Sequence, residues 1–251
     1  MRWVLVAVLM ASPVAHAEDE AQRIAFTEGR YHDAVLLSAA QPSADNLAFS
    51  ARSLLAEAVS DPGFMPPPNL LDEAEAKARE ALTLEPDHVE ARLQLAIALS
   101  LKARPLSNRE AMRTGYGDEA KALADAALDD DPDNTYAHGF LAVWHLEVRR
   151  RGGAIGGSVM GASVRKARRH YEAAIQTAPD DASIHWQYAR ALTALNAKRY
   201  REEIARSLEA AMGCQAETQL EDVMQRRAKA LRAELETKSW KRAEKTAAQM
   251  L

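Results

Sequence analysis

The feature that most constrains this chain is an internal repeat that closes three times on the dipeptide Pro-Asp. Pro86, Pro132 and Pro179 lie 46 and 47 residues apart, and each follows an alanine twelve residues earlier and another five residues earlier. These alanines are Ala74, Ala81, Ala120, Ala127, Ala167 and Ala174. A fixed period of this kind is typical of stacked repeats, in which one helical pair cannot bury its apolar face alone.

The residues between the prolines favour helices. The chain is rich in Ala, Leu, Glu, Arg and Lys, and its apolar residues recur three and four positions apart. Each Pro-Asp pair is expected to end one helix and to cap the next. No strand pattern competes with this interpretation. The sequence therefore predicts an all-α protein of antiparallel helix pairs.

This pattern resembles the tetratricopeptide repeat. In that family the second helix carries a small residue, an aromatic residue four positions on, a small residue three further, and a closing proline. Ala167, Tyr171, Ala174 and Pro179 match this order in full, and the two earlier units carry alanine at the aromatic place. The resemblance covers roughly residues 21–211. It implies a right-handed superhelix, or α-solenoid, that binds extended peptides or partner helices in its concave groove.

The N-terminus predicts a secretory signal peptide over residues 1–17. One arginine precedes an apolar run from Trp3 to Met10, and Ala15-His16-Ala17 supplies the small residues needed for cleavage. The run is too short to span a bilayer, so we expect a soluble protein in the periplasm, with an uncleaved anchor as the alternative. The formal net charge of −4 argues against nucleic acid as a partner.

Three inserts lengthen the repeats. A standard unit has about 34 residues, and the excess here lies between the two helices of each pair, at residues 60–70, 102–117 and 150–163. Because these places are equivalent, we expect the inserts to project from one edge, as a binding face or as spacers. Residues 108–128 also resemble, distantly, the family of microtubule-dynamics regulators. That stretch is short, and export argues against a cytoskeletal role.

The predicted domains are helical repeats over 18–215 and capping helices over 216–251. Leu220, Val223, Met224, Leu231 and Leu235 fall on one face, as a helix that covers the last repeat requires. The alternative is an interfacial membrane helix around Trp240 and its neighbouring lysines. The single Cys214 cannot form an internal disulfide, and we expect it to be buried or paired with another chain.

The resemblance also implies a groove for a protein or peptide partner. Its groove places fall on Leu93, Ile97, Tyr136, Phe140, Val143, Trp186, Gln187 and Arg190. Tyrosine, tryptophan and arginine are common anchors of interfaces. The alternative is that these side chains pack between repeats or under the C-terminal helices.

A second candidate is an anion-binding patch around the third insert. Glycines at 152–157 lead to a predicted helix start, where backbone N–H groups and the helix dipole favour an anion. The candidate residues are Arg150, Arg151, Ser163, Arg165 and Lys166. A phosphate loop is not expected, because Ser158 stands where that motif needs lysine. The alternative is a flexible insert joined to a solvated basic helix face.

No residue pattern indicates catalysis, a cofactor or a metal. His138, His145 and His185 fall where the repeat packs its helices together, so core packing is favoured over a zinc site. The sequence therefore predicts a periplasmic module for protein–protein interaction, without enzymatic activity. The alternative is an accessory solute-binding protein of a periplasmic transporter, whose ligand would be a small molecule.

Overall fold

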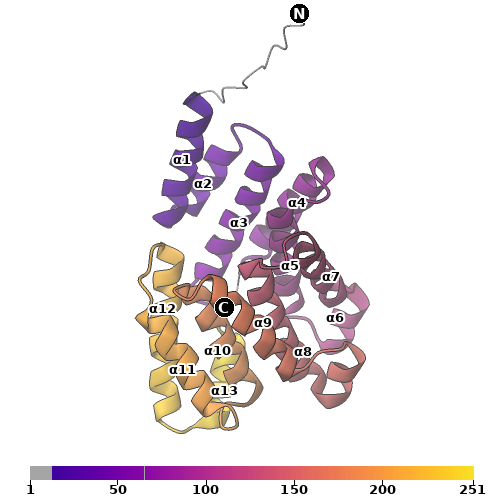
Figure 1. Cartoon of the computed structure of the whole chain (residues 1–251), viewed down its shortest axis with the longest axis vertical. Coiled ribbons are helices and arrows are strands. Elements are labelled where there is room, and N and C mark those ends of the chain that lie inside the picture. Colours follow the sequence, from indigo (N-terminus) through magenta and orange to yellow (C-terminus); the bar gives the residue numbers. More distant parts are fainter. Residues whose placement is uncertain (1–12, 65) are drawn as a thin grey trace, which may run out of the picture.

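The computed structural model describes residues 13–64 and 66–251, and these residues form helices throughout, with no strand among them (Figure 1). The predicted all-α solenoid is thereby confirmed. Residues 1–12 of the predicted signal peptide lie outside the described residues, and residues 13–17 begin the first helix.

The helices follow one another as antiparallel pairs. The pairs are α1 (Pro13–Thr27) with α2 (Tyr31–Ser38), α3 (Ala44–Ser60) with α4 (Pro68–Leu84), α5 (Val89–Ala103) with α7 (Tyr116–Asp130), α8 (Thr135–Val159) with α9 (Val164–Thr177), and α10 (Ala182–Asn196) with α11 (Arg201–Gly213). The short α6 (Asn108–Thr114) lies between α5 and α7, and the chain ends with α12 (Gln219–Glu236) and α13 (Trp240–Gln249).

The repeated alanines lie where the paired helices meet. All six alanines of the sequence pattern are fully buried, as are Ala78 and Ala124 at the aromatic place of the family. A side chain of one methyl group lets two helix backbones approach closely, which is why the period is so strict in alanine. In the third unit the aromatic residue is present, and Tyr171 stacks on Tyr188 of α10 with ring centroids 3.8 Å apart.

The sequence predicts that the aspartate of each Pro-Asp pair caps the following helix. In the structure the N-cap is instead the next residue along the chain. His88, Asn134 and Asp181 accept hydrogen bonds from backbone N–H groups in the first turns of α5, α8 and α10. The aspartate of each Pro-Asp pair instead lies in the turn. The side chain six positions after each proline then bonds to that proline's carbonyl oxygen. These contacts join Arg92 to Pro86, His138 to Pro132 and His185 to Pro179, over 3.0–3.2, 3.0 and 2.8 Å.

Within the described residues, hydrogen bonds join the second insert to the third. The guanidinium of Arg151 in the third insert donates to the carbonyl oxygens of Ala103 and Leu106 in the second, over 2.9 and 2.5 Å. The first insert instead contacts α12, where Arg227 donates to the carbonyl oxygen of Asp61. The third insert is not a loop. It continues α8 as far as Val159 across a kink at Gly153, whose φ of 62° and ψ of −151° favour glycine.

The C-terminal helices cover the last repeat. Helix α12 packs on α10 and α11, and α13 packs on α10, so the C-terminal end of the chain lies near the middle of the molecule in Figure 1. Met224 and Leu231 of α12 are buried, as the apolar stripe predicts. Cys214 is only half-buried, at the end of α11. None of the helices within residues 13–64 and 66–251 combines the length and apolar character that crossing a membrane requires.

Candidate functional site

The predicted groove is largely closed. Trp186 is 0% exposed, Arg190 is 1% exposed and Leu93 is 2% exposed, so none of the three can touch a partner in this structure. Their assignment as open partner-binding residues is therefore wrong. Trp186 and Arg190 lie under the C-terminal segment, and Leu93 of α5 packs against α7 and α8.

Backbone carbonyls of the C-terminal segment occupy the groove. The indole Nε1 of Trp186 donates to the carbonyl oxygen of Leu251 over 3.1 Å. Arg227 of α12 donates to the same oxygen over 2.9 Å. Arg104, which follows α5, donates to the carbonyl oxygens of Ala248 and Met250 over 2.9 and 2.8 Å. Donors from α10, from α12 and from the end of α5 thus converge on the end of α13.

A partly buried ion cluster lies beneath this segment. Arg190 and Arg150 donate to the two carboxylate oxygens of Glu147, over 3.0 and 2.7 Å. Burial alone would raise the pKa of Glu147, but the charges of Arg190, Arg150 and Arg104 outweigh it and lower the pKa to about 2. Burial, with the charge of Arg190, lowers the pKa of Arg104 to about 9. The sequence did not suggest Glu147 or Arg104 as groove residues.

The other predicted groove residues are partly accessible. Tyr136 is 50% exposed, and its partial burial, followed by the charge of Asp181, raises its pKa to about 12. Phe140 and Val143 are half-buried against the neighbouring helix pairs. Ile97 packs on the cluster between α3, α4 and α5, and Gln187 accepts a hydrogen bond from Arg190 over 2.9 Å.

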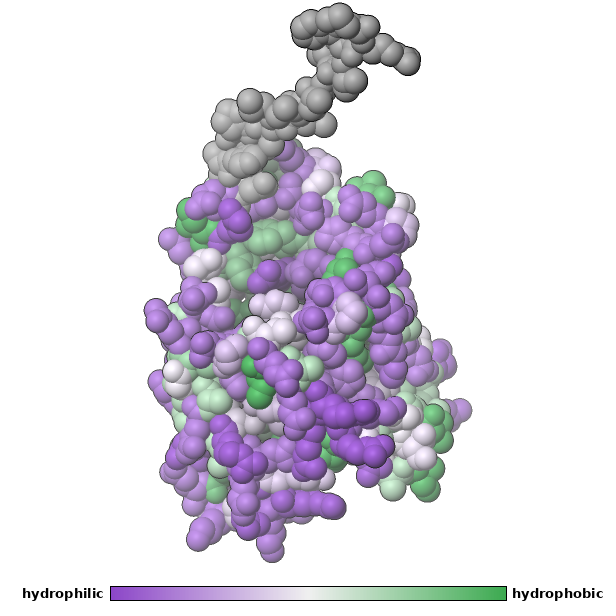
Figure 2. All heavy atoms as spheres, in the orientation of Figure 1, coloured by the Kyte–Doolittle hydropathy of each residue, from purple (hydrophilic) through white to green (hydrophobic). Residues whose placement is uncertain are grey.

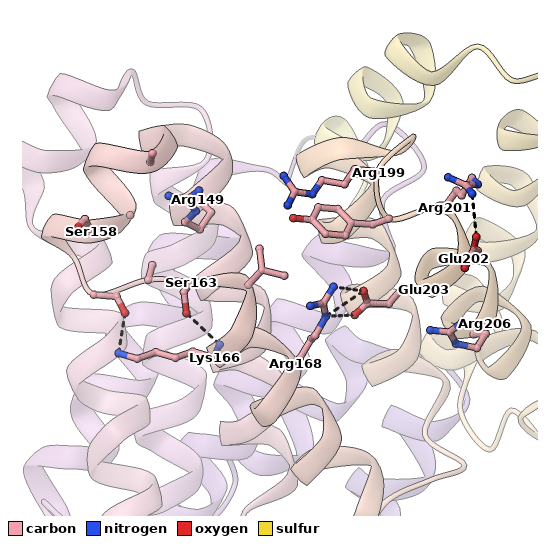
Figure 3. Close-up of a pocket in the computed structure, with 16 residues that line it drawn as sticks. Arg149, Ser158, Ser163, Lys166, Arg168, Arg199, Arg201, Glu202, Glu203 and Arg206 are labelled. Carbon is pink, nitrogen blue, oxygen red and sulfur yellow. Dashed lines mark hydrogen bonds and ion pairs between the residues drawn. The ribbon is translucent and has the colours of Figure 1, made fainter.

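An open basic cleft lies between the end of α8, the start of α9 and the turn into α11 (Figure 3). Its volume is about 840 Å³, and six cationic side chains and two carboxylates line it. The cations are Arg149, Lys166, Arg168, Arg199, Arg201 and Arg206, and the carboxylates are Glu202 and Glu203. Hydrophilic residues also dominate the face of the molecule shown in Figure 2.

Only two of these cations are neutralised by carboxylates of the cleft. Arg168 makes a two-pronged contact with Glu203, which raises the pKa of Arg168, and Arg201 pairs with Glu202 over 2.9 Å. The other four form no salt bridge with any residue in the described part of the chain. They are Arg149, Lys166, Arg199 and Arg206. The cleft therefore presents an excess of positive charge on a chain whose net charge is −4.

Part of the predicted anion patch lies in the cleft. Ser163 and Lys166 line the cleft, and Ser163 caps α9 by accepting from the backbone N–H of Lys166 over 3.1 Å. Arg165 is exposed but is not among the lining residues. Arg150 and Arg151 do not line the cleft, because they bond to Glu147 and to the second insert respectively.

Sequence reasoning missed the far wall of the cleft. Arg199 and Arg206 come from the turn between α10 and α11 and from α11, more than thirty residues after Ser163. The basic run around residues 198–206 was a usable signal. This run would have predicted a wall of the cleft only if the packing of α11 beside α9 and α10 had been known.

Three histidines cluster between α8 and α9. Nδ1 of His138 lies 2.9 Å from Nδ1 of His170, and the ring of His145 lies 5.6 Å from that of His170. Burial, followed by the charge of a neighbouring histidine, lowers the pKa of both His145 and His170 to about 4. Residues 13–64 and 66–251 contain no group of three or more His, Cys, Asp or Glu side chains placed to hold a metal ion.

The architecture matches a known family. The family model for Regulator of microtubule dynamics protein 1-3 matches residues 67–236, from the turn before α4 to the end of α12. The chain belongs to this family. The match takes in the last three repeat pairs and both walls of the basic cleft, and it extends far beyond the stretch at 108–128.

Solved structures support the fold of this family member. The crystal structure of a thermophilic tetratricopeptide-repeat protein from Thermus thermophilus is similar, with a TM-score of 0.52 at 16% sequence identity. The similarity covers 91% of this chain and 97% of that one, and at this identity it concerns the fold alone. Among curated proteins, none matches the chain.

Proposed function

We propose that this family member is an exported protein-interaction module that binds an acidic segment of a partner protein in the basic cleft, without catalysis of its own. The observation that carries the proposal is the set of four cations without salt bridges, supplied by α8, α9 and the region of α11. The cations come from separate helices, whose packing gathers them around one cleft before the partner arrives. Such preorganisation lowers the cost of binding.

The charge of the cleft selects the chemistry of the partner. The chain as a whole carries a net charge of −4, whereas cations outnumber carboxylates in the cleft, so the cleft attracts a negatively charged segment. Complementary potentials of this kind raise association rates and set orientation. Arginine also suits the task, because its planar fork binds carboxylates through two parallel hydrogen bonds.

Apolar side chains beside the cleft favour a protein over a small solute. Ile155 and Val159 are 82% and 81% exposed, and they flank Ser158 and Gly157 of the cleft wall. A partner that placed acidic residues in the cleft would be able to cover these two side chains with its own apolar residues. The step from the repeat fold to protein binding is analogy, and the cleft supplies its physical content.

The compartment is part of the proposal. The name of the family refers to microtubule dynamics, but the predicted signal peptide would place this chain in the periplasm, where a different partner is required. Fractionation of cells that express the chain, with N-terminal sequencing of the mature protein, tests this point. A new N-terminus at residue 18 in the periplasmic fraction supports export, and an intact N-terminus in the cytosol contradicts it.

Charge reversal tests the cleft itself. Arg199→Glu with Arg206→Glu should reduce capture of the partner by at least tenfold in quantitative affinity purification, because two of the four cations without salt bridges change sign. The matched control is Lys77→Glu with Lys229→Glu, two lysines that do not line the cleft. Equal capture by both double variants would contradict a site in the cleft.

A small polyanionic solute is the second candidate. The cleft volume of about 840 Å³ falls within the range of small-molecule sites, about 300–1,000 Å³. Native mass spectrometry of the purified protein distinguishes the two. A retained small molecule that is lost in the Arg199→Glu/Arg206→Glu variant favours the accessory solute-binding function, whereas a captured protein favours the interaction module.

A further inference from the structure

The concave groove beneath α13 places charged groups beside an apolar floor, in which Leu192 and Leu231 pack with Ala247 and Met250. Glu147, Arg190 and Arg104 meet there, and Arg190 is 1% exposed. Elsewhere in the solenoid the helices meet through alanine and leucine. Burying an ion pair is often less favourable than packing apolar residues of the same volume. The charged groups in the floor of the groove therefore contribute little to the stability of the core, whereas they suit the binding of a polar ligand.

The donors of the groove all recognise backbone. Trp186, Arg190, Arg104 and Arg227 donate to carbonyl oxygens of residues 247–251, over 2.8–3.4 Å. The last four carbonyl groups of any helix lack partners within the helix, and cations placed there also complement its dipole. The groove therefore fits the C-terminal end of a helix, whatever side chains that helix carries on its outer face.

A small set of side chains sets the specificity. Ala243 and Ala247, one turn apart on α13, are fully buried, and Met250 and Leu251 are 5% and 2% exposed. This is the spacing with which a bound amphipathic helix anchors itself in a groove. The opposite face of α13 is exposed and basic, with Lys241, Arg242 and Lys245.

The segment is joined to α12 by a strained turn. Lys238 has φ of 56°, in the left-handed region that is unfavourable for a residue with a side chain. Beyond its end, α13 is fixed chiefly by Glu244, which accepts from the backbone N–H of Ala197, and by Glu234, which binds Arg242 and Thr246. Release of the segment would relieve the turn. It would also break these polar contacts and the hydrogen bonds to residues 247–251, and it would expose the buried face of α13, so a partner helix must replace all of them.

We propose that residues 240–251 are an intramolecular ligand of this groove, and that the groove binds in exchange a partner helix with small residues one turn apart and two apolar residues after its last turn. This site is separate from the basic cleft. The partner's carbonyl groups would take the places now held by those of residues 247–251. Its small residues would take the places of Ala243 and Ala247.

A cleavable linker tests the exchange without removing any residue. A protease site inserted after Lys238 in the full chain allows α13 to be cut free, and a fluorescent peptide of residues 239–251 serves as the probe. We expect the cut protein to bind the probe at least tenfold more tightly than the uncut protein, by fluorescence anisotropy. The same peptide with Ala247→Glu is the control and should not bind. Equal binding to cut and uncut protein would overturn the proposal.

The same preparation tests whether the segment is merely structural. If dilution releases α13 and the circular dichroism of the remainder collapses, residues 240–251 are part of the core and the proposal is wrong. If the helix signal is retained, the groove exists without them. The control for cutting is an identical site placed after Cys214, in the turn between α11 and α12, whose cleavage should leave probe binding at the level of the uncut protein.

An uncut variant provides independent evidence. Ala247→Glu in the full chain places a carboxylate on the buried face of α13 and should raise probe binding by at least tenfold. Lys245→Glu, on the exposed face, should leave it unchanged. If Ala247→Glu melts like the unaltered protein and still does not bind the probe, the groove is not a peptide site. Arg199→Glu/Arg206→Glu should not affect these results, because that pair lines the other site.

Discussion

The indole of Trp186 donates its hydrogen bond to the carbonyl oxygen of Leu251, 65 residues later in the chain, across 3.1 Å. This contact ties the last repeat helix to the end of the sequence and converts a predicted binding residue into a buried one. It also changes what substitution of Trp186 should do. A side chain open to a partner would be removable at little cost in stability.

Trp186→Phe should destabilise the protein by about 1 kcal/mol, because it removes one hydrogen bond and leaves a buried carbonyl with one donor fewer. Trp186→Ala should cost about 3–5 kcal/mol, because it also creates a cavity. Urea unfolding followed by circular dichroism measures both. Tyr136→Ala, at a half-exposed position of the same groove, is the matched control and should cost much less. Similar values for all three variants would contradict the buried contact.

Glu147→Gln should be among the most damaging single substitutions in the chain. It removes the charge that compensates Arg190, which is buried with only 2% of its side chain exposed, so a loss of about 3–5 kcal/mol is expected. Because the pKa of Glu147 is lowered to about 2, its contribution is present above the unfolded value near 4.5 and is lost as the pH falls toward 2. Chemical denaturation at pH 7 and pH 3 measures both effects, and an unchanged midpoint at pH 7 would disprove the role.

The regular part of the structure was predictable because its determinants are local. Ala74, Ala120 and Ala167 recur at a fixed distance from a proline, and a small residue at that place is needed wherever two helices cross closely. The groove was not predictable, because its contents depend on residues 247–251 folding back over α10. Nothing in the sequence near Trp186 encodes that return. The resemblance to known repeats described a groove but could not say that this chain fills it.

The basic cleft could be predicted from the sequence in part. Ser163 and Lys166 were found from a local pattern, a glycine-rich stretch before a helix start. Arg150 and Arg151 were grouped with them because they are close in sequence, but on a helix successive residues point in different directions. Arg199 was missed because its place in the cleft depends on how two consecutive helix pairs pack.

Stability should also fall between pH 6.5 and pH 4 because of the histidine cluster. Burial, followed by the charge of a neighbouring histidine, lowers the pKa of His145 and His170 to about 4, and Lys121 and Lys166 add to the effect on His145. In this window the unfolded chain, with histidine pKa values near 6.5, binds more protons than the native state does. The free energy of unfolding therefore decreases as the pH falls. Allowing for solvent screening at the half-buried His170, each histidine contributes on the order of 2 kcal/mol, lost as the pH falls through that range.

Replacing one histidine isolates this effect. His170→Gln should flatten the dependence of the melting temperature on pH between 7 and 4.5, whereas His32→Gln, on α2 and exposed, should leave it unchanged. Thermal melts at half-unit steps of pH measure the slopes. The same slope in both variants would show that other groups control the response to acid.

Arg151 should hold the second and third inserts together. Its guanidinium bonds to the carbonyl oxygens of Ala103 and Leu106, and Asn108 donates to the carbonyl oxygen of Arg151 itself over 3.0 Å. Arg151→Ala leaves two partly buried carbonyl groups without these donors, so the segments around 104–107 and 152–162 should open locally while the repeat core stays intact. Limited proteolysis should then cut in these segments at least tenfold faster than in the unaltered protein. Arg165→Ala, an exposed arginine of the neighbouring helix, is the control, and equal cleavage of both variants would mean that Arg151 does not join the inserts.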